Sequence, residues 1–269
     1  MKIGMPILAE LGTVKQHIDL CRELGLDFVE LNMHYPCCMD DNIDWNLIHS
    51  CKDIFFTVHM NAVIEAGELD EQIRKMFMDY SIATMRTFIE KAGIRKFNFH
   101  LTRGGRTPLP HGSAYTFTLF RQEYMAALKR SFDELSAFAR DTGAEICFEN
   151  ITAQPFLVDA FELLFTYPNL HATFDVGHDA KGDDALGKLF MHHPHKVRHM
   201  HLHDYNGTVD HRELGTGHLD IASLFTFCKK HDIDTVHRSS RCGRVAKVRP
   251  IHEKSCDVTH IMPQHVAVV

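Results

Sequence analysis

The amino-acid sequence predicts a single (β/α)₈ barrel of the TIM type, an α/β fold, and three observations support this prediction. The chain has 269 residues, and such barrels typically need roughly 250. Hydrophobic residues make up 45% of the chain, enough to bury a large core. Short apolar runs alternate with longer amphipathic stretches, which is typical of a parallel sheet built from βα units with right-handed crossovers.

Seven such units follow one another along the chain. Strands are expected at residues 2–7, 28–33, 55–60, 96–101, 145–150, 172–176 and 197–204. Helices are expected at residues 14–24, 45–51, 70–92, 117–140, 156–165, 184–191 and 221–231. Glycine and proline predict a loop at residues 103–112. Seven units in a chain of this length favour a closed barrel over an open sheet, with an eighth strand near Thr235.

Composition and charge indicate where the protein is located and which classes of partner it can have. No apolar run approaches the ~20 residues that cross a bilayer, and the N-terminus lacks the layout of a signal peptide. The eight cysteines contain no Cys-x-x-Cys pair, so we expect a cytoplasmic protein with reduced cysteines and no membrane partner. The net charge of −6 argues against a nucleic-acid partner, although residues 237–269 hold six basic and two acidic side chains.

Side chains that can bind a metal end strand after strand. They are His59, His100, Glu149, Asp175 and His201, on the third to the seventh expected strands. Barrel enzymes place their working residues at the C-terminal ends of the strands, which face one mouth. Carboxylates combined with imidazoles suit Zn²⁺, Mn²⁺ or Co²⁺ better than Ca²⁺, with Mg²⁺ as a further candidate. The sequence therefore predicts a divalent metal site at this mouth.

Four strings carry a resemblance to a known family: Phe148-Glu149-Asn150, Asp175-Val176-Gly177-His178, His201-Leu202-His203-Asp204 and His211-Arg212-Glu213-Leu214-Gly215-Thr216-Gly217. They resemble the xylose isomerase-like TIM barrels, over about residues 1–236. That group includes sugar-phosphate isomerases and epimerases, and the endonuclease IV type of apurinic/apyrimidinic endonuclease. The resemblance implies Glu149, Asp175 and His201 as ligands of the main metal. In the nuclease branch, further zinc ions would be held by His59, His100, His178 and His211.

The sequence departs from this pattern at two places. Val209 stands where the nuclease pattern has an aspartate two residues before the histidine that matches His211. The family also ends its eighth strand in a metal-binding glutamate, whereas no carboxylate lies between Asp234 and Glu253. A shifted reading frame after Val236 would explain the second departure, because an alternative frame permits Ile-Glu-Val-Val-Asp in place of His-Arg-Ser-Ser-Arg. The other explanation is a divergent tail, with ligands such as His237 or Glu253.

The domain prediction follows from the second departure. Residues 1–236 are expected to form the barrel, and residues 237–269 an atypical basic tail that replaces the last strand and helix. A buried barrel strand should be apolar and β-branched, and residues 237–244 are polar and basic.

Three functions stay open at this point. The first is a metal-dependent sugar or sugar-phosphate isomerase or epimerase acting through an enediolate, in which Glu149 moves the proton and His178 orients the substrate. Arg103, Arg106 and Asn150 are then the expected substrate contacts. The second is a zinc-dependent endonuclease at abasic sites, the only reading with a nucleic-acid partner. The third is a barrel damaged at its C-terminus and inactive, with exposed strand edges that favour association into oligomers.

Overall fold

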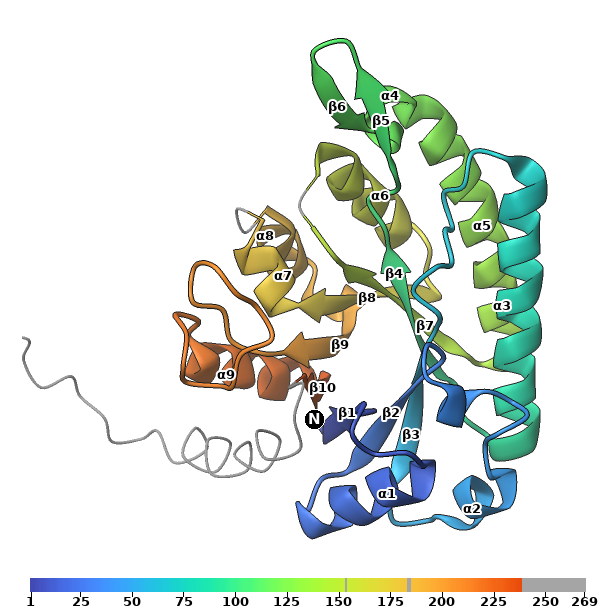
Figure 1. The fold of residues 1–269 in the computed structure, drawn as a ribbon, viewed down its shortest axis with the longest axis vertical. Helices are drawn as coiled ribbons and strands as arrows, with labels where there is room; N and C mark the ends of the chain where they lie inside the picture. Colours follow the sequence, from blue (N-terminus) through green and yellow to red (C-terminus); the bar gives the residue numbers. More distant parts are fainter. Residues whose placement is uncertain (153, 183–184, 239–269) are drawn as a thin grey trace, which may run out of the picture.

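Eight parallel strands close into a barrel in the computed structural model, which describes residues 1–152, 154–182 and 185–238 (Figure 1). Around the barrel the strands follow the order β1-β10-β9-β8-β7-β4-β3-β2. Their bounds are Ile3–Pro6 (β1), Phe28–Asn32 (β2), Phe55–His59 (β3), Lys96–Leu101 (β4), Glu145–Asn150 (β7), Leu170–Asp175 (β8), Val197–Leu202 (β9) and Asp234–His237 (β10). The predicted TIM-type barrel is confirmed.

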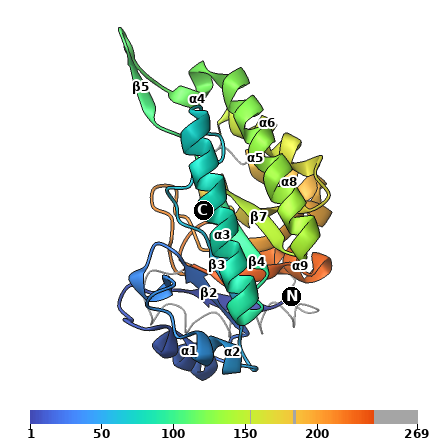
Figure 2. The same ribbon diagram turned by 90° about the vertical axis from the view of Figure 1, so that its right-hand side faces the viewer.

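Helices surround the barrel, and α3 and α5 run side by side along one flank (Figure 2). The helices are Val14–Glu23 (α1), Trp45–Ser50 (α2), Glu71–Ala92 (α3), Thr116–Leu119 (α4), Arg121–Thr142 (α5), Pro155–Phe165 (α6), Val176–Ala180 (α7), Ala185–His192 (α8) and Ile221–His231 (α9), with single 3₁₀ turns at Pro36–Cys38 (η1) and Pro194–Lys196 (η2). Among the described residues no helix is long and apolar enough to span a membrane.

Local signals set the ends of these helices. The side chain of Asp70 accepts the backbone N–H groups of Gln72 and Ile73, which caps the start of α3. Gly93 ends the same helix with a φ of 70°, a left-handed conformation that glycine adopts at little cost. Thr13 caps α1 in the same way through the N–H of Gln16. These caps explain why the expected and observed helix bounds agree closely at these positions.

The chain differs from the prediction between β4 and α5. Residues 103–112 were expected to be a loop, but most of them belong to an antiparallel hairpin of β5 (Arg106–Leu109) and β6 (Gly112–Tyr115). The hairpin projects beyond the barrel (Figures 1 and 2). Glycine and proline predict turns, but they do not reveal which backbone groups pair across a turn. The single helix expected over residues 117–140 is interrupted at Phe120, whose φ is −119°.

The eighth strand is present as β10, near Thr235 as predicted. It pairs with β9 on one side and with β1 on the other, Thr235 lying beside both Met200 and Ile3. In the described part of the chain the barrel is therefore closed, and the exposed edges expected of a damaged barrel are not found. His237 is buried, and neither of its ring nitrogens has a hydrogen-bond partner, which is costly. Residues 239–269, with most of the predicted tail, lie outside the described residues.

The barrel strands divide into an apolar outer face and a polar inner face. Phe99 and Phe148 lie on the outer face with ring centroids 5.3 Å apart, and Phe132 of α5 packs on Phe148 at 5.0 Å. Burying such rings is a large part of the stability of the barrel. The residues next to these two phenylalanines along the strands, Asn98 on β4 and Glu149 on β7, are buried and polar. Because side chains alternate along a strand, the helices cover the aromatic face and the polar face lines the barrel interior.

Glu65, in the segment after β3, should make the stability of the fold depend on pH. Its carboxyl group accepts the N–H of Gly67 at 3.1 Å and contacts the hydroxyl of Thr102. Burial raises the pKa of Glu65 to about 8. The folded state therefore keeps this carboxyl protonated while the unfolded chain ionises it. Stability should fall as the pH rises from about 4.5 towards 8.

Glu65→Gln removes this ionisation. We expect the variant to exceed the parent protein at pH 8 by on the order of 3 kcal/mol in the free energy of unfolding, with little difference near pH 4.5. Urea unfolding at both pH values measures this, and Glu90→Gln, at an exposed position on α3, is the control. A difference between Glu65→Gln and the parent that does not change with pH would contradict the expectation.

Candidate metal centre

The predicted metal-binding residues converge at the C-terminal ends of the barrel strands. Glu149 of β7 belongs to two groups of three side chains whose ligand atoms lie within 4.8 Å of one another. One group contains His59 of β3 and His100 of β4, and the other contains Asp175 of β8 and His201 of β9. The parallel strands bring these side chains to one mouth of the barrel.

The hydrogen bonds of His59 indicate that the first group suits a cation. Its Nδ1 lies 2.9 Å from the backbone oxygen of Met60, and a carbonyl can only accept, so Nδ1 carries the proton. Burial lowers the pKa of His59 to about 4, which leaves the ring neutral at neutral pH and Nε2 with a lone pair. That lone pair lies 3.1 Å from Oε2 of Glu149. Two facing acceptors are repulsive unless a cation binds both, as a metal does.

The second group also fits a divalent metal. Asp175 and His201 are fully buried, and Nδ1 of His201 lies 3.0 Å from Oε1 of Glu149. Oδ2 of Asp175 has no hydrogen-bond partner, which is costly for a buried carboxylate oxygen. Two carboxylates and one imidazole form a ligand set typical of Zn²⁺, Mn²⁺ or Co²⁺. The donor chemistry and the unpartnered oxygen therefore both favour a bound metal.

A cation from the chain itself reaches this second group. Arg238 directly follows β10, and its side chain is 16% exposed. Its Nη1 lies 3.0 Å from Oε1 of Glu149, 3.2 Å from Nδ1 of His201 and 4.0 Å from Oδ2 of Asp175. The family resemblance leads us to expect a metal-binding glutamate at the end of this strand, and the chain places an arginine there instead. A metal and the guanidinium compete for the same carboxylates, so metal binding requires Arg238 to move.

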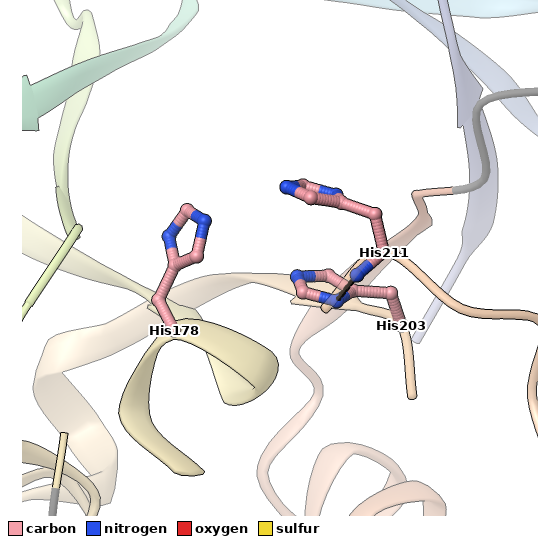
Figure 3. A group of neighbouring side chains, drawn as sticks. All are labelled: His178, His203 and His211. Atoms are coloured by element: carbon pink, nitrogen blue, oxygen red, sulfur yellow. Dashed lines mark hydrogen bonds between the residues drawn. The ribbon is translucent and has the colours of Figure 1, made fainter. Parts of the chain in front are cut away.

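Three histidines form a further group beside Asp175, and Figure 3 shows His211 above His203, with His178 facing both. The rings of His203 and His211 stack with centroids 4.2 Å apart. Nδ1 of His203 accepts the backbone N–H of His211 at 2.8 Å (Figure 3), so its Nε2 carries the proton and donates to Oδ1 of Asp175 at 2.8 Å. His203 therefore orients Asp175 and, in this arrangement, does not offer a lone pair to a metal.

Asp204 shapes the loop that carries His211. Its Oδ2 accepts the backbone N–H groups of Gly215 and Gly217, both at 2.9 Å. A Cβ atom on Gly217 would lie 2.2 Å from Oδ1 of Asp204, so glycine is needed for this close approach. The Gly-x-Gly string thus folds the loop back onto the end of β9.

The predicted substrate contacts lie in two different places. Arg103 and Arg106 are exposed, and their guanidinium groups lie over the ring of Tyr115 on the projecting hairpin. Asn150 is fully buried, and its side-chain amide binds the backbone N–H and C=O of Asp175. These two hydrogen bonds indicate that Asn150 aligns β7 with β8. The contacts of all three residues with a substrate stay predictions.

Four side chains at the centre were not singled out from the sequence. Glu30 of β2 contacts His201, Asn98 of β4 donates to Oε2 of Glu149 at 2.9 Å, and His203 and Arg238 act as described above. Glu30 could have been identified from the sequence, since a carboxylate inside the apolar run of β2 is rarely buried without a partner. The contacts of the other three depend on the register between strands and on side-chain orientation, which the sequence pattern does not give.

Comparisons with known proteins agree with this architecture. The model of the family described as xylose isomerase-like TIM barrel matches residues 18–239. An uncharacterised protein of Methanocaldococcus jannaschii is 23% identical over 239 residues, which cover 86% of this chain and 88% of that protein.

Two solved structures share the fold. A D-tagatose 3-epimerase-like protein has a TM-score of 0.77 at 18% identity, covering 96% of this chain and 98% of its own. The IOLI protein with a bound zinc atom has a TM-score of 0.73 at 17% identity, covering 95% and 96%. Because the family model spans most of the chain, this protein belongs to the xylose isomerase-like TIM barrel family.

Proposed function

We propose that this protein is a metal-dependent sugar isomerase or epimerase that acts on a keto sugar or its phosphate through an enediolate. The observation that carries the proposal is the position of Glu149, whose two carboxylate oxygens face His59, His100, Asp175 and His201 at one barrel mouth. The epimerase-like protein and the zinc-containing protein of the same fold support the choice of substrate class and cofactor.

Glu149, Asp175 and His201 would hold the metal. A bound divalent ion acts as a Lewis acid that stabilises the negative charge formed when a proton leaves the carbon beside a carbonyl. Although burial alone would raise it, the pKa of Glu149 lies well below its usual value, because His201, Arg238 and His100 stabilise the carboxylate. Glu149 is therefore ionised at neutral pH and able to accept that proton.

His178 would orient the substrate. Its Nδ1 lies 3.1 Å from the backbone oxygen of Asn150, so the proton of the neutral ring is on Nδ1 and Nε2 is an acceptor. An acceptor at the mouth suits a sugar hydroxyl. Protonation of the enediolate on the opposite face of the same carbon would give an epimer, and protonation at the neighbouring carbon would give an isomer.

The test is hydrogen exchange during turnover. Protein loaded with Mn²⁺ or Co²⁺ is incubated in D₂O with keto sugars and their phosphates, and the products are followed by NMR. We expect deuterium at the carbon beside the carbonyl together with a new epimer or isomer. Glu145→Gln, which alters the opposite end of β7, should keep this activity, and Glu149→Gln should lose it. Metal-loaded protein that exchanges no proton with any of these sugars would contradict the proposal.

Endonuclease activity at abasic sites is the second candidate. The group of His59, His100 and Glu149 favours it, because a zinc cluster needs ligands beyond the main site. One observation disfavours it: Val209 replaces the expected aspartate with a side chain that is 52% exposed. The zinc-loaded protein is therefore expected not to cleave a duplex with one abasic site, and cleavage that requires His59 and His211 would reverse the order of the two candidates.

A further inference from the structure

We propose that Glu30 is a positioning residue that holds the ring of His201 and sets which of its nitrogens keeps the lone pair for the metal. This inference rests on the proposed metal centre and assigns a role to a side chain outside the ligand groups that share Glu149. Glu30 lies on β2, three strands from β7 around the barrel, and is 1% exposed. Its carboxylate is the side chain that binds His201 from the side away from Glu149.

The contacts of His201 place the ring between two carboxylates. Nε2 lies 3.1 Å from Oε1 of Glu30, and Nδ1 lies 3.0 Å from Oε1 of Glu149. The ring itself is fully buried. Rotation of the ring by half a turn would put ring carbons where the two nitrogens lie, so these contacts fix the ring orientation, and the position of the proton decides which nitrogen keeps a lone pair.

Glu30 sets the tautomer of His201 because an ionised carboxylate can only accept hydrogen bonds. The proton of a neutral His201 ring is therefore on Nε2, and Nδ1 keeps the lone pair that a metal requires. The contact of Arg238 agrees with this assignment, since a guanidinium can only donate and its Nη1 lies 3.2 Å from Nδ1 of His201. A carboxylate behind a ligating histidine is a recurrent way to fix both tautomer and ring orientation.

His199 provides an internal comparison. Its Nε2 also binds Glu30, at 2.9 Å, but its Nδ1 has no hydrogen-bond partner and it belongs to neither group that contains Glu149. If Glu30 only filled the barrel interior, loss of His199 and loss of Glu30 would have similar effects. If Glu30 positions His201, only the change at Glu30 should reach the metal centre.

The experiment compares Glu30→Met, Glu30→Gln and His199→Leu in the full chain, each also in the Arg238→Ala background. Methionine keeps the volume and removes the acceptor, and glutamine keeps an acceptor oxygen. We expect Glu30→Met to weaken Co²⁺ binding about 10- to 100-fold, Glu30→Gln to weaken it less, and His199→Leu to bind like its parent. Long-range ¹H–¹⁵N NMR of the metal-free protein, recorded at a pH above the raised pKa of His201 so that the ring is neutral, should report His201 protonated on Nε2 in the parent, and a mixture of tautomers in Glu30→Met.

The outcomes separate this inference from the proposed function. An unchanged His201 tautomer in Glu30→Met, or equal loss of Co²⁺ binding in Glu30→Met and His199→Leu, would overturn the positioning role. Absence of Co²⁺ binding in both parents would instead count against the metal centre, and the NMR comparison would still decide the role of Glu30. Should Glu30→Met fail to fold, Glu30→Gln must show the mixture of tautomers, because its amide can either accept from or donate to the ring.

Discussion

Replacement of Arg238 is expected to strengthen divalent-metal binding, by at least about a hundredfold for Arg238→Glu. In the structure Nη1 of Arg238 lies 3.0 Å from Oε1 of Glu149 and 4.0 Å from Oδ2 of Asp175. Removing this positive charge ends the competition for two carboxylates, and a glutamate adds a third carboxylate. Two unit charges about 4 Å apart interact by about 4 kcal/mol near a protein surface, so the effect should be large.

Calorimetric titration with Co²⁺ or Mn²⁺ measures this effect. Arg238→Ala should show a smaller gain than Arg238→Glu, because it removes the competing cation without adding a ligand. Arg198→Ala is the matched control, since Arg198 lies at the other end of the barrel and binds Glu145. Metal affinity that is unchanged or lower in both Arg238 variants would mean that the guanidinium does not compete for this site.

Glu149→Gln is expected to weaken metal binding about a thousandfold, the size of effect that follows removal of one partner from a buried charged group, and to abolish turnover with it. Glu149 is the one residue shared by the two groups described above, and it is fully buried. An amide of the same shape keeps the packing and removes the charge that a dication needs.

Glu145→Gln is the control for Glu149→Gln, on the same strand and the same face. Glu145 lies at the N-terminal end of β7 and pairs with Lys96 at 3.0 Å, away from the metal centre. Metal content by mass spectrometry and the rate of deuterium exchange are compared for the two variants. If both lost metal equally, the effect would come from damage to β7, and the central position of Glu149 would be refuted.

The ends of the strands were predictable because the sequence shows the hydrophobic patterns of both strands and helices. Apolar runs flanked by amphipathic stretches indicate strands and helices, and the C-terminal ends of parallel strands meet at one mouth. His59, His100, Glu149, Asp175 and His201 could therefore be placed near one another without knowing a single contact. The start of α1 and both ends of α3 follow from local capping residues.

The inner contacts could not be predicted in this way, because they join strands that are remote in sequence. Glu30 and His201 are 171 residues apart and meet across the closed barrel, so their contact depends on barrel closure and register. Arg238 belongs to a segment whose polar composition argues against a buried strand, yet β10 is held by backbone pairing with β1 and β9. Backbone hydrogen bonds are indifferent to side-chain type, and this allows the predicted strand near Thr235 to continue to His237, the first residue of the predicted tail.

A crystal structure of the protein soaked with Co²⁺, with anomalous scattering recorded at the cobalt edge, tests the metal centre most directly. We predict one strong peak about 2.0–2.3 Å from carboxylate oxygens of Glu149 and Asp175 and from Nδ1 of His201, with the guanidinium of Arg238 displaced from its position beside Glu149. A peak confined to His178 and His211, or no peak at Glu149 in crystals of Arg238→Ala soaked in the same way, would contradict the account.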